Sequence, residues 1–232
     1  MVGSTQFIAK PAGFGLSAIR CSSYGPSSCA PALAAPGNNP GASDARGAAF
    51  IQAGANFSVS VSALNAAGAV TPNFGHEAVP EGVTLGSSLL APAGGHLASL
   101  ANPSGFGAFS LGVASGNSFS WSEVGALGLT PRLASGDYLG TGDVATSPTV
   151  AVGRFIPARL AITSPSLVHR ATASCSPAAS FSYLGEPFQL GFDVSAQGLS
   201  GDWGKARTAT FKRRKLPFTV LQTNSRNEKK AQ

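Results

Sequence analysis

Charged side chains are scarce in this chain, and the few that are present are unevenly distributed. Only 11% of the 232 residues are Asp, Glu, Lys or Arg, a composition that disfavours surface helices rich in those residues. Residues 1–204 hold seven Lys or Arg and nine Asp or Glu, whereas residues 205–232 hold nine and one. The formal charge of +6 therefore belongs to the tail, and the body of the chain offers no basic surface for nucleic acid.

Sequence signatures of catalysis, of a cofactor and of a membrane span are also missing. The chain contains no nucleophile-elbow, zinc-helix, phosphate-loop or dinucleotide pattern, so we expect neither an enzyme nor a bound cofactor. Three cysteines and three histidines lack the spacing of a zinc site. No apolar run approaches the roughly 18–20 residues of a transmembrane helix, and the first residues lack the layout of a signal peptide.

The cysteines leave two interpretations open. Cys21 and Cys29 enclose the short loop "CSSYGPSSC", and a disulfide between them would stabilise the fold by roughly 2–3 kcal/mol. Two reduced thiols fit the same spacing, because spacing alone does not determine pairing. Cys175 is left without a partner in either case.

The clearest positive signal is an alternating strand pattern that occurs twice. In "FSVSVSA", residues 57–63, apolar side chains alternate with serines, as expected for a strand with one buried face. An ungapped alignment places Phe57 on Phe188 and continues the same alternation through "FQLGFDV". The apolar row of the second copy contains Phe188, Leu190, Phe192 and Val194. A strand of this kind needs a second sheet over its apolar face, so the pattern predicts a sandwich.

Further short strands are expected between turn signals rich in Gly, Pro, Ser and Asp. They fall at residues 82–85, 106–113, 118–124, 127–133, 149–152 and 159–163, and no segment shows capped helical periodicity. The sequence thus predicts an all-β fold of tandem Ig-like antiparallel β-sandwich units, the second incomplete. We expect a first unit at residues 1–152, the opening strands of a truncated second unit at 153–204, and a basic tail at 205–232.

Several stretches together resemble a known bacterial family. "AGANFSVSVSALNAAGAVTPNFG", "FSWSEVG", "GDYLGTG", "VGRFIPARL" and "FSYLGEPFQLGFDVSA" look like landmarks of a domain of unknown function. That domain occurs in large surface proteins described as Q components of mannose-sensitive haemagglutinin (MSHA) pilus biogenesis. The resemblance implies an exported, β-rich protein of the bacterial cell surface, with other pilus or surface components as partners and with no catalytic residues to transfer.

The resemblance ends near Gly204, where the composition changes abruptly. The change to Lys, Arg and Asn in "KARTATFKRRKLPFTVLQTNSRNEKKAQ" is typical of a shifted reading frame or of a misjoined fragment, and a solvated, disordered tail explains the same composition. A basic arm for nucleic acid or anionic lipid is the functional alternative, although no specific nucleic acid is expected. Its cationic run consists of Lys212, Arg213, Arg214 and Lys215.

Two small sets of residues are candidates for a binding site. Asp137 and Asp143 bracket "DYLGTGD", where carboxylates could hold Ca²⁺, although turn-forming Asp beside Gly explains the same pattern. Trp121, Tyr138 and Trp203 could form a platform that stacks on sugars, whereas core packing is the alternative for Trp121, which alternates with Phe119. The two functional hypotheses are a structural or adhesion module and a carbohydrate-binding adhesin module.

Overall fold

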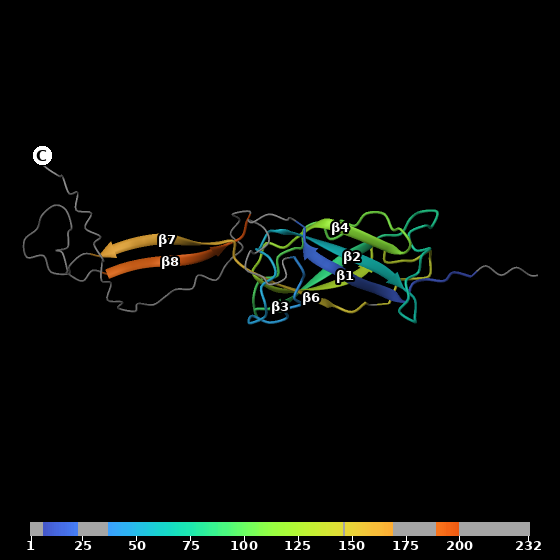
Figure 1. Ribbon diagram of the computed structural model, residues 1–232, viewed down its shortest axis with the longest axis horizontal. Helices are drawn as coiled ribbons and strands as arrows, with labels where there is room; N and C mark the ends of the chain where they lie inside the picture. Colours follow the sequence, from blue (N-terminus) through green and yellow to red (C-terminus); the bar gives the residue numbers. More distant parts are fainter. Residues whose placement is uncertain (1–6, 23–36, 146, 169–188, 200–232) are drawn as a thin grey trace, which may run out of the picture. The chain divides into compact units, whose positions relative to one another are not determined.

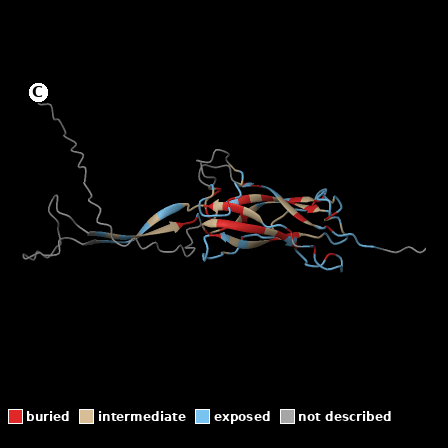
Figure 2. Cartoon of the chain, turned by 90° about the horizontal axis from the view of Figure 1, so that it is seen from below, coloured by how far each residue is buried: buried red, intermediate tan, exposed pale blue. Residues whose placement is uncertain are grey.

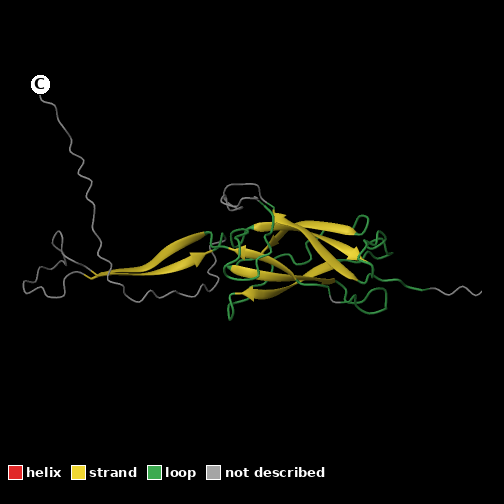
Figure 3. Cartoon of the chain, turned by 60° about the horizontal axis from the view of Figure 1, so that its bottom comes forward, coloured by secondary structure: helices red, strands yellow, loops and turns green. Residues whose placement is uncertain are grey.

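The described part of the chain is built from strands alone. A computed structural model describes residues 7–22, 37–145, 147–168 and 189–199, and these contain eight strands and no helix (Figure 3). The predicted all-β class is therefore confirmed. The described residues up to Ala161, with those from Ala196 to Leu199, form one compact unit, here called the sandwich unit. A second unit lies within Ile162–Ser195 and is called the hairpin unit.

The sandwich unit contains two antiparallel sheets of three strands each (Figure 1). The first has the order β1-β2-β4, formed by β1 (Gly13–Cys21), β2 (Asn56–Leu64) and β4 (Val113–Ser120). The second has the order β3-β5-β6, formed by β3 (Val83–Ala91), β5 (Gly125–Leu133) and β6 (Val150–Phe155). Consecutive strands thus often lie in opposite sheets, which ties the two layers together through the chain itself.

The predicted alternation of β2 is confirmed. Its apolar row of Phe57, Val59, Val61 and Ala63 is 0% exposed, while the intervening serines are half-buried on the other face. Phe57 and Val59 belong to a buried cluster that also contains Leu85, Leu127 and Leu129 of the second sheet. The two sheets therefore bury their apolar rows against each other, which is the packing that a half-apolar strand requires.

A parallel segment extends the second sheet beyond β6. The Phe50 amide donates to the Arg154 carbonyl at 2.8 Å, and the Ile156 amide donates to the Ile51 carbonyl at 2.9 Å. Phe50 and Ile51 are buried in the same cluster as Phe155. These contacts keep residues 153–156 in the sandwich unit, so the first unit extends to Ala161 and not only to the expected residue 152.

The strand expected at residues 106–113 is wrong. Leu111 and Gly112 both have positive φ values, of 50° and 74°, so the chain turns back there and enters β4 at Val113. A β-carbon on Gly112 would collide with the Thr71 carbonyl. The Ser110 amide and the Val113 amide each bond to the other residue's carbonyl across this turn, at 2.9 and 3.0 Å. A left-handed residue pair of this kind interrupts a strand, and alternation alone does not reveal it.

The hairpin unit contains most of β7 (Arg159–Val168) and β8 (Gln189–Gln197), which pair in a two-stranded sheet. Ser166 Oγ donates to the Gly191 carbonyl at 3.4 Å. Leu190 is 48% exposed and Phe192 is 41% exposed. Figure 2 shows the contrast, because buried residues follow the sandwich strands while β7 and β8 are mostly half-buried or exposed. The expected second unit, the opening strands of a truncated sandwich at residues 153–204, stays a prediction.

Candidate functional site

The loop after β5 holds the two aspartates that the sequence offered as calcium ligands. One carboxylate oxygen of Asp137 accepts the Gly142 amide at 2.7 Å, and one of Asp143 accepts the Val144 amide at 2.7 Å. Lys10 Nζ donates to the Thr141 and Asp143 carbonyls, each at 2.9 Å. Both aspartates thus stabilise a turn, and an ammonium group already occupies the carbonyls that a cation would use.

Nothing else in the described ranges completes a metal site. Residues 7–22, 37–145, 147–168 and 189–199 contain no group of three or more His, Cys, Asp or Glu side chains that could hold a metal ion. The calcium hypothesis for Asp137 and Asp143 therefore has no geometric support, and the hydrogen bonds favour the turn interpretation.

Tyr138, in the same loop, forms a partly buried polar contact with the loop between β2 and β3. Its hydroxyl donates to Glu77 Oε1 at 2.7 Å, and the Glu81 amide donates to Glu77 Oε2 at 3.3 Å. The tyrosine ring stacks on Phe74 with a centroid distance of 6.0 Å. The contact therefore joins two loops that are 61 residues apart in the sequence.

This contact changes the acidity of both partners. Burial and the hydrogen bond to the Glu77 carboxylate raise the pKa of Tyr138 to about 12. Burial by itself would raise the pKa of Glu77, but hydrogen bonds from the Tyr138 hydroxyl and from backbone amides outweigh it, so the pKa of Glu77 is lowered. The geometry therefore favours ionised Glu77 beside neutral Tyr138, an arrangement that holds loops together.

The proposed sugar platform is not formed by the two aromatic residues that the structure describes. Trp121 is 0% exposed and Tyr138 is 6% exposed. Trp121 Nε1 donates to the Ala98 carbonyl at 3.1 Å, and its ring meets Phe155 edge-on with centroids 5.1 Å apart. Neither ring has a free face for a sugar, so this hypothesis is wrong for both residues. Trp203 lies outside the described residues.

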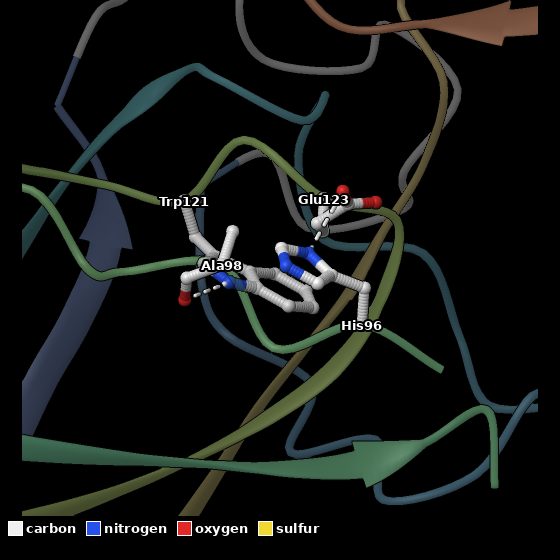
Figure 4. A network of polar contacts seen from close by, with 4 residues as sticks. All are labelled: His96, Ala98, Trp121 and Glu123. Atoms are coloured by element: carbon white, nitrogen blue, oxygen red, sulfur yellow. Dashed lines mark hydrogen bonds and ion pairs between the residues drawn. The ribbon is translucent and has the colours of Figure 1, made fainter. Parts of the chain in front are cut away.

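Beside Trp121 lies a contact between a histidine and a glutamate that the sequence did not indicate (Figure 4). His96 Nδ1 is 3.5 Å from Glu123 Oε1, and the side chains are 63% and 11% exposed. The two residues are far apart in the sequence and share no motif, so only the fold brings them together. A lone His–Glu pair supplies two ligands or one acid–base couple, which is too few groups to define a metal or catalytic centre.

The remaining candidates lie wholly or partly outside the described residues. Cys21 is 5% exposed and is disulfide-bonded. Its expected partner Cys29 and the third cysteine Cys175 are not described, so the pairing of Cys21 with Cys29 stays a prediction. The cationic run Lys212, Arg213, Arg214 and Lys215 is also outside the described residues. Within the described ranges, no helix is long and apolar enough to cross a membrane.

Comparison with known proteins identifies a domain family. The second domain of DUF6701 matches residues 10–120, and its third domain matches residues 123–227. The third-domain match includes most of the basic tail, so the expectation that the family pattern ends near Gly204 is wrong. No curated protein and no solved structure matches the chain.

The two family matches meet inside the sandwich unit. The junction at residues 121–122 falls between β4 and β5. The sheet β1-β2-β4 lies wholly in the second-domain match. The sheet β3-β5-β6 combines β3 of the second-domain match with β5 and β6 of the third-domain match. The chain therefore belongs to the DUF6701 family and carries its second and third domains, which share one β-sandwich.

Proposed function

We propose that this chain is a non-catalytic structural segment of an exported bacterial surface protein, of the class associated with MSHA pilus biogenesis. In this role it connects and spaces other parts of a long surface chain. The polar contacts of the described fold join its loops to one another, as expected for a structural role.

The sandwich shared by two family domains carries the proposal. β3 of the second domain pairs with β5 of the third along the whole strand, from Val83 opposite Leu133 to Ala91 opposite Ala126. Phe57 and Phe119 of the second domain are buried in one cluster with Leu127 and Phe155 of the third. Pulling the two domains apart would break a sheet and expose a core, so they are joined more firmly than domains linked by a flexible peptide.

The disulfide of Cys21 supports export. Stable disulfides form in the periplasm, at the cell surface and outside the cell, and they are rare in the reducing cytosol. Cys21 ends β1 at the margin of the buried core.

Single-molecule force spectroscopy on the full chain tests the structural role. With the disulfide reduced, we expect strands β1 to β6 to rupture in one event that releases about 50 nm of chain, at roughly 3.6 Å for each residue. Leu129→Ala should lower the rupture force without dividing the event, because Leu129 lies in the shared core. Two separate ruptures matching residues 10–120 and 123–161 would contradict a shared mechanical unit.

A further inference from the structure

The hairpin unit interrupts the sandwich unit in the sequence. The sandwich unit includes the chain up to Ala161 and again from Ala196, so the chain leaves the sandwich, forms most of β7 and β8, and returns. The returning residues, which the structure describes as far as Leu199, follow directly on the hairpin unit. Their attachment to the sandwich determines how the hairpin unit responds when the chain is stretched.

Backbone hydrogen bonds hold the returning residues at two points. The Ala158 amide donates to the Gln197 carbonyl at 2.8 Å, and the Leu199 amide donates to the Ala53 carbonyl at 2.9 Å. Ala53 lies in the second-domain match, and Ala158 lies in the third-domain match. The returning residues are therefore bound to both family domains of the sandwich unit.

Side-chain packing makes this attachment specific. Gln197 is 8% exposed, and its Oε1 accepts a hydrogen bond from Arg159 Nε at 2.6 Å, which is stronger than a neutral bond because the donor is charged. Gly198 is buried. A β-carbon at Gly198 would be 3.1 Å from the Ala53 carbonyl oxygen and 3.4 Å from the Ser122 carbonyl oxygen. The space at this position therefore fits glycine and excludes a branched side chain.

We propose that Gln197 to Leu199 form a mechanical clamp, which passes tension from the sandwich unit directly to the chain after Leu199 and keeps it off the hairpin unit. The proposal rests on the structural role proposed above, because a clamp matters only in a chain that bears load. Tension that reaches Leu199 from the C-terminal side acts first on its hydrogen bond to Ala53. It then acts on the contacts of Gln197, before it reaches the rest of β8.

The hairpin unit is the mechanically weak part of the described chain. A two-stranded sheet is only marginally stable by itself, and Leu190 and Phe192 of β8 are 48% and 41% exposed. Pulling on the two ends of such a sheet separates its hydrogen bonds one after another, so the sheet resists little force. The clamp joins these two ends through Ala158 and Gln197, so the load bypasses the hairpin unit.

Single-molecule force spectroscopy on the full, reduced chain tests the clamp. In the wild type, we expect a separate event at lower force than the rupture of β1 to β6. It should release residues 158–197, about 14 nm of chain at roughly 3.6 Å for each residue. Gly198→Val should abolish this event, because the branched side chain would displace the segment from the Ala53 carbonyl. The same length should then extend gradually at low force, while the rupture of β1 to β6 stays unchanged.

Leu199→Ala is the matched control. The Leu199 side chain is 42% exposed and the clamp uses only its backbone amide, so the clamp event should persist at the wild-type force. Gln197→Ala should lower that force, because Arg159 loses its acceptor while the backbone hydrogen bonds remain. A clamp event of equal force in the wild type and in Gly198→Val would place the resistance in the hairpin unit and overturn the proposal, as would its absence from the wild type.

Hydrogen exchange measured by NMR detects the clamp without load. The amides of Ala158 and Leu199 should exchange at least about tenfold faster in Gly198→Val than in the wild type, and equal rates would overturn the clamp. The amide of Val59 in β2 should exchange as in the wild type, which shows that the sandwich unit remains folded. Division of the β1 to β6 rupture into two events would contradict the shared mechanical unit and not the clamp, so the two proposals fail separately.

Discussion

Two copies of one strand pattern have different environments in this protein. β2 and β8 have the same alternation of apolar and polar residues, and each pairs with the strand that precedes it. The row of β2 packs against a complete second sheet, whereas the described part of β8 faces none. The comparison shows that alternation specifies a strand and its apolar face, while burial depends on what the rest of the chain brings to that face.

The energetic consequence of this difference is large. Burying a side chain such as Val or Phe contributes roughly 1.5–3 kcal/mol, and fixing a residue in a strand costs about 1–2 kcal/mol of conformational entropy. The burial of four side chains in β2 therefore approximately offsets the cost of ordering that strand. An uncovered row gains little of this, so an isolated hairpin is only marginally stable.

The largest expected effect comes from a charge in the row of β2. Val61→Asp should destabilise the sandwich unit by more than about 4 kcal/mol, because the carboxylate would have no partner in an apolar cluster. The corresponding change in β8, Phe192→Asp, should leave the unfolding of the sandwich unit unaltered. Urea denaturation followed by circular dichroism measures both.

Ser60→Asp is the control for this comparison. Ser60 faces the other side of β2, where its hydroxyl contacts the Ser115 hydroxyl at 2.7 Å in an exposed position. We expect a loss of only about 1 kcal/mol there. Similar losses for Val61→Asp and Ser60→Asp would mean that β2 does not have one buried face.

A cavity in the aromatic core should have the next largest effect. Phe57 meets Phe50 and Phe155 edge-on, with centroid distances of 6.2 and 5.8 Å. Phe57→Ala should cost about 3–5 kcal/mol in the free energy of unfolding, as expected for a large buried ring. Phe192→Ala is the matched change in the hairpin unit and should not shift the urea midpoint of the sandwich unit. A shift of that midpoint by Phe192→Ala as large as that by Phe57→Ala would contradict the division into two units.

Loss of the disulfide should have an intermediate effect. Reduction should lower the stability of the sandwich unit by about 2–4 kcal/mol, because the open chain gains conformational entropy on unfolding. If Cys29 is the partner of Cys21, Cys29→Ser should reproduce that loss and Cys175→Ser should not. Thermal unfolding with and without reductant measures the change, and the opposite result for the two serine variants would assign the bond to Cys175.

The smallest expected effect concerns the contact between Tyr138 and Glu77. Tyr138→Phe should cost about 1–2 kcal/mol at neutral pH, because one oxygen of Glu77 loses its hydroxyl donor. The hairpin unit should show the same hydrogen exchange as in the wild type. A change in hydrogen exchange that is confined to the hairpin unit would contradict the assignment of this contact to the sandwich unit.

The same contact predicts a pH dependence at both ends of the scale. The pKa of Glu77 is lowered in the fold, so its contribution is present above the usual value of 4.5 and is lost as the pH falls through the folded pKa. The pKa of Tyr138 is raised, so its contribution is present below 10.0 and is lost as the pH rises toward about 12. Tyr138→Phe should weaken both slopes in a series of urea titrations, and slopes equal to those of the wild type would rule out this coupling.

Particular elements show how far the sequence predicts the fold. The alternation at residues 57–63 predicted the buried face of β2 correctly, because a period of two has one structural meaning in a short apolar segment. The strand expected at residues 106–113 failed because Leu111 and Gly112 turn the chain, a conformation that hydrophobic patterning does not encode. The sequence therefore predicts a single alternating segment, but it does not predict a backbone reversal inside a segment whose apolar pattern continues.

The candidate site residues were less predictable than the strands. Trp121 and Tyr138 are aromatic residues that each carry a polar atom, and residues of this type occur both in cores and on binding surfaces. Their hydrogen-bond partners, Ala98 and Glu77, are 23 and 61 residues away. Such long-range partners decide between the two roles, and composition cannot supply them.

The sequence by itself determined the all-β class and the apolar faces of the repeated strand, because these depend on local composition and on a period of two residues. The tertiary structure alone decided that β3 pairs with β5 across the junction of two family domains, that Lys10 contacts the loop of Asp137 and Asp143, and which distant strands cover β2. These features depend on which distant segments meet in space. Many pairings are compatible with the same alternation, and only the packing of the whole sandwich selects among them.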